Sequence, residues 1–387
     1  MHNNCFNRVH IKYLILIVLI VATTTYGQIY IGDYMGIHSE ILHEQRVLLV
    51  HLPEDYDDSE ARYPVMYLLD GDANFHHVTG LVDFLSDLDH MPQMIVIGIR
   101  NIDRIRDFTP TPMAHLSTSG GAEHFLKFLK DELIPSIDAN YRTVPHRLLV
   151  GHSFSGLFSI YTVMAAPNLF NAHFVISPYL LYEENTILDD AKHLMQSGNE
   201  DPHLLYVAVS SEEKKLLAPC RQLKRIIKRN PEYNYQFKLD VIDDSDHATV
   251  HHDAVYEGLK ELYRDWQFPL RDVTGGVQAL KLHYSNLSQR LGYKVIPKEH
   301  DVNNIGYTLL TAGRRTAAIA VFEYNVSLYP GSANAFDSLG ESYAEIMELA
   351  LALENFQHAV NKGINNSDPN LHIYQKHFSD LQEEMKE

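Results

Sequence analysis

Short apolar runs bounded by turn residues recur through the first two thirds of the chain. They follow an alternating stretch over 29–53 and lie at 64–69, 94–99, 148–150, 172–176, 204–209 and 235–242. Continuous runs of this kind are typical of strands that are buried on both faces. Helical patterns separate them, and the clearest, over 122–137, places its apolar residues on one stripe. The alternation predicts an α/β fold with a mainly parallel sheet covered by helices.

After Trp266 the pattern becomes purely helical and then repeats. A helix is predicted over 277–291, and beyond it three positions recur 34 residues later: Gly306, Ala318 and Phe322 return as Gly340, Ala352 and Phe356. This spacing, with a helix–turn–helix rhythm, is the tetratricopeptide period. Two copies cannot bury their apolar faces alone, so the 277–291 helix and the preceding domain, or a second subunit, are expected to complete the core. The repeats either bind a protein partner or serve as a structural cap or dimerisation element.

The N-terminus has the pattern of a secretory signal. Arg8 and Lys12 precede an apolar run over 13–22, which is short for a membrane span. Cleavage is expected after Gly27, which predicts a secreted or periplasmic protein; an uncleaved anchor is the alternative. Cys220 would then be the only cysteine of the mature chain, so no internal disulfide is expected.

The expected division of the chain follows from these patterns. It is a signal peptide over 1–27, an α/β domain over 28–268, a linker and helix over 269–300, and tetratricopeptide-like repeats over 301–387. The formal net charge of −18 repels phosphate backbones, so a nucleic-acid partner is not expected.

The stretch G-H-S-F-S-G at 151–156 joins a predicted strand to a predicted helix. The apolar run 148–150 precedes it, and apolar residues at helical spacing follow over 157–166. A serine at such a turn is typical of the nucleophile elbow, which lifts the hydroxyl above the sheet edge. Ser153 is therefore the candidate nucleophile, and a serine in an ordinary glycine-rich loop is the alternative. Ser155 departs from the usual motif, which has glycine there.

The candidate base follows the last predicted strand. A serine hydroxyl needs a base to take its proton, and an imidazole needs a third group to hold its tautomer. His247 ends the loop 243–247, whereas His251 and His252 are expected on the helix that comes next. A metal cluster of His247, His251 and nearby aspartates lacks a recognised ligand spacing, so no metal is predicted.

The acid is expected after the strand at 204–209, because the usual chain order is serine, acid, histidine. Glu212 and Glu213 both lie within reach of that position, and either could instead be a solvated loop charge beside Lys214 and Lys215. Glu212 is preferred, and Glu213 stays open.

Two backbone N–H groups must face the negative charge that develops on the substrate oxygen. Phe154, directly after the nucleophile, supplies one. The loop 70–75 contains Gly71, which permits a close approach of the backbone, so the N–H of Asp72 is predicted as the second donor. The carboxylate of Asp72 must then point away from that oxygen.

Three arginines follow the strand at 94–99, namely Arg100, Arg104 and Arg106. They either hold an anionic acyl or siderophore group, or form ion pairs with Asp103 and Asp107. Ion pairing is preferred.

The motifs Y-L-L-D-G-D, G-I-R-N-I-D-R-I-R-D-F-T-P, G-H-S-F-S-G and D-S-D-H together resemble the putative-esterase (esterase D-like) group of α/β-hydrolases, over roughly residues 29–266. The resemblance implies Ser153 as nucleophile, His247 as base and Glu212 as acid. The group includes feruloyl esterases, enterochelin-type siderophore esterases, S-formylglutathione hydrolases and mycolyltransferases. Similar secreted bacterial chains carry a C-terminal tetratricopeptide-like segment.

The expected function is that of an exported serine esterase without a cofactor. Its expected substrates are aryl or acyl esters of carbohydrates or small molecules, as in feruloyl esterases. A siderophore ester is the alternative substrate, and an acyltransferase or a non-catalytic binding protein on the same fold stays open. A protein partner or a homodimer through the repeats is also possible.

Overall fold

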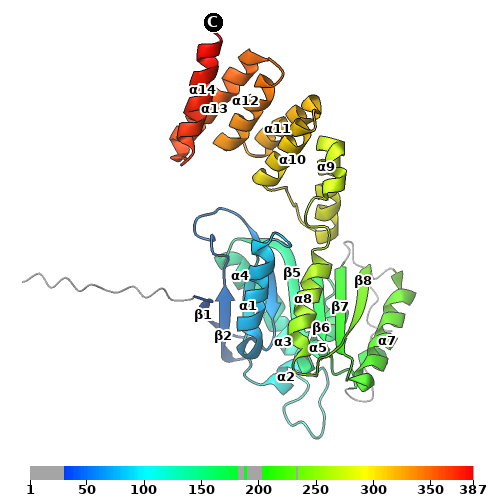
Figure 1. The fold of residues 1–387 in the computed structure, drawn as a ribbon. Helices are drawn as coiled ribbons and strands as arrows, with labels where there is room; N and C mark the ends of the chain where they lie inside the picture. The colour runs from blue at the N-terminus through cyan, green and yellow to red at the C-terminus, as the bar shows by residue number, and fades with distance from the viewer. Residues whose placement is uncertain (1–29, 182–186, 190–202, 232–233, 387) are drawn as a thin grey trace, which may run out of the picture. The chain divides into compact units, whose positions relative to one another are not determined.

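The predicted strands assemble into one mainly parallel sheet (Figure 1). A computed structural model of the chain describes residues 30–181, 187–189, 203–231 and 234–386. Within them the sheet has eight strands in the order β1-β2-β4-β3-β5-β6-β7-β8. They are β1 (Asp33–Ser39), β2 (Glu44–His51), β3 (Tyr63–Leu68), β4 (Ile95–Ile99), β5 (Thr143–His152), β6 (Ala172–Ile176), β7 (His203–Ser210) and β8 (Tyr235–Ile242). β2 pairs antiparallel with β1 and β4, and the other neighbouring strands are parallel. The predicted α/β fold is confirmed.

Strand β5 is much longer than its apolar run at 148–150. Its first half contains polar residues and pairs with β3 near the end of the sheet, where Tyr63 lies opposite Thr143 and Val65 opposite Arg147. Hydrophobicity marks only the buried part of a strand, so the pattern misses such an extension.

Helices cover both faces of the sheet (Figure 1). On one face α1 (Gly71–Asp87) and α8 (Val250–Leu262) pack against the strands and each other. On the other face α5 (Phe154–Ala165) and α7 (Lys214–Arg229) share an apolar core. The parallel strands end at the same edge of the sheet. The loops that follow them lie together there, which is where α/β proteins bind their ligands.

The predicted helix over 122–137 is helical throughout but not uniform. It consists of α3 (Ala122–Phe128), a π-helical turn (Leu129–Leu133) and α4 (Ile134–Asn140). Pro135 near the start of α4 lacks an N–H and needs room for its ring, which accounts for the widened turn before it.

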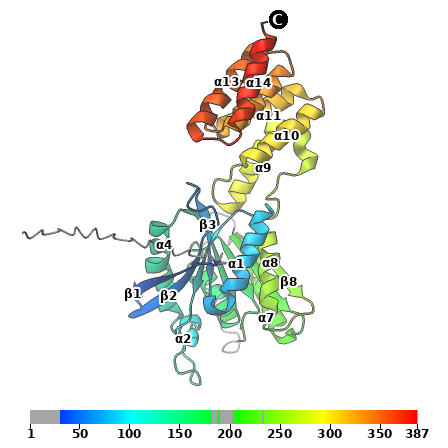
Figure 2. The ribbon, with the colours of Figure 1, turned by 60° about the vertical axis from the view of Figure 1, so that its left-hand side comes forward.

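Beyond a 3₁₀ turn (Leu270–Gly275) all regular elements that the structure describes are helices (Figure 2). The helices are α9 (Gly276–Leu291), α10 (Glu299–Thr311), α11 (Arg315–Leu328), α12 (Ala333–Ala344), α13 (Leu349–Asn366) and α14 (Leu371–Glu384). The helix predicted over 277–291 is α9, and it packs against α11.

The 34-residue spacing corresponds to a repeated helix contact. A Cβ added to Gly306 would lie 2.5 Å from the Phe322 ring, and one added to Gly340 would lie 2.6 Å from the Phe356 ring. Each glycine therefore lets an aromatic ring of the next helix lie directly against its backbone. Whether these helices are tetratricopeptide repeats stays a prediction.

The predicted signal peptide and its cleavage point lie outside the described residues. Among the helices that the structure describes, none combines the length and apolar character needed to cross a bilayer. Residues Gly32–Glu387 cluster as one unit, so the predicted boundary at 268 stays a prediction.

Candidate active site

Ser153 lies at a strained turn between β5 and α5. Its backbone has φ 60° and ψ −112°, a conformation that costs about 1–3 kcal/mol for a residue other than glycine. Neighbouring backbone holds it on both sides: the Ser153 N–H donates to the Ile176 carbonyl at 3.0 Å, and the Ser153 carbonyl accepts from the Tyr179 N–H at 3.1 Å. This is the geometry expected of a nucleophile elbow.

The glycines of the motif have steric roles. A Cβ on Gly151 would lie 2.3 Å from the Ser155 carbonyl oxygen, and one on Gly156 would lie 3.1 Å from that of Ile176. Both positions therefore favour glycine because a neighbouring backbone passes close to them.

Ser155, the departure from the usual motif, is part of a buried polar network beneath the elbow. Its Oγ accepts the His152 N–H at 2.7 Å and lies 2.6 Å from Oδ2 of Asp70, to which it donates. Arg104 binds Asp70 with both Nε and Nη2, at 2.6 and 3.0 Å, and its Nη2 also donates to the His152 carbonyl at 3.0 Å. The network thus fixes the residue that precedes Ser153.

Asp70 is ionised in this network although it is buried. Burial alone would raise its pKa, but hydrogen bonds and the positive charge of Arg104, with further hydrogen bonds from Ser155 and Asn101, hold the pKa below its ordinary value. Removing any one of its hydrogen-bond donors would leave part of a buried negative charge unsatisfied and would lower the free energy of unfolding.

Replacing Ser155 by Ala is expected to destabilise the fold by about 1.5–3 kcal/mol, the range for a hydrogen bond to a charged group. Ser159 on the same helix offers a matched control, because it is equally buried but bonds a neutral carbonyl, that of Ser155, at 3.0 Å. Ser159→Ala should cost about 0.5–1.5 kcal/mol. Urea unfolding measures both; equal losses would contradict the assigned role of the Asp70 network.

His247 and Glu213 form the contact expected of a histidine and its acid. Nδ1 of His247 lies 2.5 Å from Oε1 of Glu213. Glu213 follows β7 and caps α7, and its other oxygen accepts a hydrogen bond from the Ser177 hydroxyl. His247 follows β8, in a loop where the Asp246 carboxylate accepts the N–H groups of Ala248 and Thr249 at 2.9 and 2.8 Å. The site residues therefore follow β5, β7 and β8, at one edge of the sheet.

The preference for Glu212 as the partner of His247 is wrong for this structure. The Glu212 side chain is exposed, while that of Glu213 is mostly buried against His247. Strand β7 ends at Ser210 and two turn residues follow, so Glu213 rather than Glu212 is the N-cap residue of α7, directly before Lys214. The start of the amphipathic pattern at 214 is the signal that could have separated them.

His152, the residue before Ser153, lies beside His247. Its ring centroid is 4.6 Å from that of His247. Burial, with the nearby His247, lowers the pKa of His152 to about 4, so at neutral pH it is uncharged. A neutral ring here would not oppose a positive charge on His247.

The two predicted oxyanion donors both begin helices. Phe154 is the first residue of α5, and Asp72 is the second residue of α1. Within the part of the chain that the structure describes, neither N–H donates to a protein acceptor. The Asp72 carboxylate accepts a hydrogen bond from the Asn101 N–H at 3.3 Å. This contact holds the carboxylate away from the N–H of Asp72 itself. A Cβ on Gly71 would lie 2.6 Å from the backbone of Gly98 in β4, so this position favours glycine because the loop packs against the sheet. The role of the Asp72 N–H as oxyanion donor stays a prediction.

Of the three arginines after β4, two form ion pairs and one is exposed. Arg106 forms the predicted pair with Asp107, at 2.8 Å, and also contacts Glu44. Arg104 pairs with Asp70 and not with Asp103, a partner that the local sequence did not indicate. Arg100 is exposed beside Asn101 at the same sheet edge.

The family model for "putative esterase" matches residues 39–275. The chain belongs to this esterase family. The predicted resemblance is thereby confirmed, and the match contains Ser153, Glu213 and His247.

Two relatives of this chain are siderophore esterases by name, and the chain spans about three fifths of the length of the first of them. The chain is 30% identical over 177 residues to the ferri-bacillibactin esterase BesA of Bacillus subtilis, covering 40% of this chain and 61% of BesA. It is 23% identical over 252 residues to the siderophore triacetylfusarinine C esterase of Aspergillus fumigatus, covering 56% and 86%. The crystal structure of an IroE-like serine hydrolase from Shewanella oneidensis is similar with a TM-score of 0.66 and 27% identity, covering 77% of this chain and 99% of that one.

Proposed function

We propose that this protein is an exported serine esterase that hydrolyses siderophore esters. The contact between His247 Nδ1 and Glu213 Oε1 carries the proposal. It fixes the proton on Nδ1 and leaves Nε2 with a lone pair that can accept the proton of Ser153.

The reaction would proceed in two halves. His247 Nε2 takes the proton of the Ser153 hydroxyl while Oγ forms a bond to the ester carbonyl carbon, and the N–H groups of Phe154 and Asp72 stabilise the oxyanion. The imidazolium, paired with Glu213, gives its proton to the departing alkoxide, and an acyl-enzyme remains. Water, deprotonated by His247, then releases the acid and restores Ser153.

The substrate class rests on the relatives and on charge. Both named relatives act on siderophores, which favours a siderophore ester over the feruloyl-type ester preferred from the sequence. Arg100 supports an anionic substrate, because it is exposed at the active edge and Arg104 and Arg106 are already paired. Export rests on the N-terminal pattern, and the C-terminal helices are proposed to be tetratricopeptide-like.

A substrate panel with the chain from Gln28 onward tests this function. A siderophore oligoester, in its ferric and iron-free forms, is compared with a feruloyl ester and an acetylated sugar. The expected kcat/KM for a siderophore form is at least about tenfold higher than for the other two, a difference of about 1.4 kcal/mol in transition-state binding. A preference for the feruloyl ester or the acetylated sugar would contradict the proposed substrate class. Ester turnover that survives in Ser153→Ala would count against the mechanism instead.

A further inference from the structure

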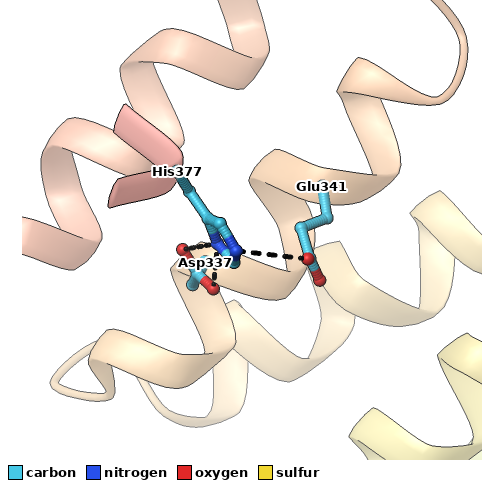
Figure 3. A group of neighbouring side chains, drawn as sticks. All are labelled: Asp337, Glu341 and His377. Carbon is cyan, nitrogen blue, oxygen red and sulfur yellow. Dashed lines mark hydrogen bonds and ion pairs between the residues drawn. The ribbon is translucent and has the colours of Figure 1, made fainter. Parts of the chain in front are cut away.

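A cluster of metal-ligand side chains lies far along the chain from the esterase site, between the last helices. Asp337 and Glu341 are four residues apart on α12, and His377 reaches toward them from α14 (Figure 3). Nδ1 of His377 lies 3.1 and 3.0 Å from the two Asp337 oxygens, and its Nε2 lies 3.8 Å from Oε1 of Glu341.

The donor atoms are spaced for one cation. A nitrogen of His377 and one oxygen each from Asp337 and Glu341 lie within 4.8 Å of one another. Zinc binds nitrogen and oxygen at about 2.0–2.2 Å, so its tetrahedral ligand atoms lie about 3.4 Å apart, and side-chain rotations of Glu341 and His377 would close the difference. Among the described residues this is the one group of three or more such side chains with this spacing. Ligands four residues apart on a helix share a face, as in known zinc motifs.

The charge of the cluster is unbalanced. The Asp337 side chain is only 8% exposed, and among the described residues neither Asp337 nor Glu341 pairs with a lysine or arginine. Glu341 accepts a hydrogen bond from the Tyr307 hydroxyl, which is neutral. Two carboxylates at this helical spacing also repel each other. Among the described residues, His377 is the one group paired with both that can carry a compensating positive charge.

We propose that Asp337, Glu341 and His377 bind one divalent cation of the zinc class, which fastens α14 to α12. One imidazole and two carboxylates form a mixed nitrogen and oxygen set that suits such cations, with water completing the coordination. The cation supplies the missing positive charge to a buried carboxylate. The cation would also stabilise the position of a helix that is held by few apolar contacts, since only Tyr374 and Leu381 of α14 are buried.

Zinc titration of the full mature chain, without a histidine tag and after chelator treatment, tests the site. The chain has 23 histidines, so a second close pair must be controlled: Nδ1 of His252 lies 3.2 Å from Nδ1 of His77. Calorimetry at pH 7.5 is expected to find one strongest site per chain. Asp337→Asn, Glu341→Gln and His377→Ala should each weaken it at least about tenfold, while His252→Ala leaves it unchanged.

Thermal unfolding gives a second readout. Zinc should raise the unfolding temperature of the wild type and of His252→Ala, and have little effect on the three ligand variants. Glu341 is partly exposed, so its glutamine variant should fold even if Asp337→Asn does not. No zinc binding, binding that survives all three substitutions, or binding lost in His252→Ala would each overturn the proposal.

Discussion

Ser153→Ala is expected to abolish ester turnover while the protein remains folded. The variant loses only the hydroxyl that we propose as the nucleophile, and its methyl group fits the same turn. In other serine hydrolases the loss of the nucleophile lowers kcat by about a millionfold, and binding with the oxyanion donors leaves a small residual rate. The kcat/KM for a chromogenic acetate ester should therefore fall at least about a thousandfold, with an unchanged unfolding midpoint.

Ser159→Ala is the matched control, because Ser159 lies on the same helix and bonds only the Ser155 carbonyl. Its kcat/KM should stay within about tenfold of wild type, provided that the measurement is made well below its unfolding temperature. If Ser153→Ala retains more than about a thousandth of the wild-type rate after contaminating esterases are excluded, Ser153 is not the nucleophile.

Glu213→Gln should show the second largest effect. Glutamine keeps the size of the side chain but removes the negative charge that stabilises the His247 imidazolium and holds its tautomer. In another serine hydrolase the equivalent change lowers kcat by about 10⁴. Glu212→Gln is the natural control, one residue away and exposed, and should lower kcat less than about tenfold. Both are measured on one small ester at pH 8.

The pair of variants separates three outcomes. A large loss in Glu213→Gln alone agrees with the 2.5 Å contact to His247. A larger loss in Glu212→Gln would contradict the assignment of the acid. Two small losses would contradict a three-residue mechanism and point to Ser153 and His247 acting without an acidic partner.

The sheet and the elbow could be predicted because burial leaves a clear pattern. Strands β6 and β8 have the predicted bounds. The motif has glycine at 151 and 156, and in the structure a neighbouring backbone passes close to both positions. The 34-residue period similarly predicted the repeated contact between a glycine and a phenylalanine ring.

The apolar run of β7 does not identify the acid; only the start of the amphipathic pattern of α7 at 214 could have separated Glu212 from Glu213. Neighbouring residues in a turn point in different directions, and two glutamates in sequence give the same polar pattern. The network of Asp70, Arg104 and Ser155 was missed for another reason: its members come from three distant segments, and only the fold brings them together. Ser155 departs from the usual motif, and it contributes a hydrogen bond to the buried carboxylate of Asp70.

Covalent labelling with a fluorophosphonate tests the proposed catalytic site most directly, because the probe reacts with a serine only when a base activates its hydroxyl. Intact mass and peptide mapping should find one adduct per wild-type chain, on Ser153. Labelling should be as fast in Glu212→Gln as in wild type, much slower in Glu213→Gln and His247→Ala, and absent in Ser153→Ala. An adduct on another residue, or an equal rate in His247→Ala, would contradict the assignment of Ser153, His247 and Glu213 as the site of ester hydrolysis.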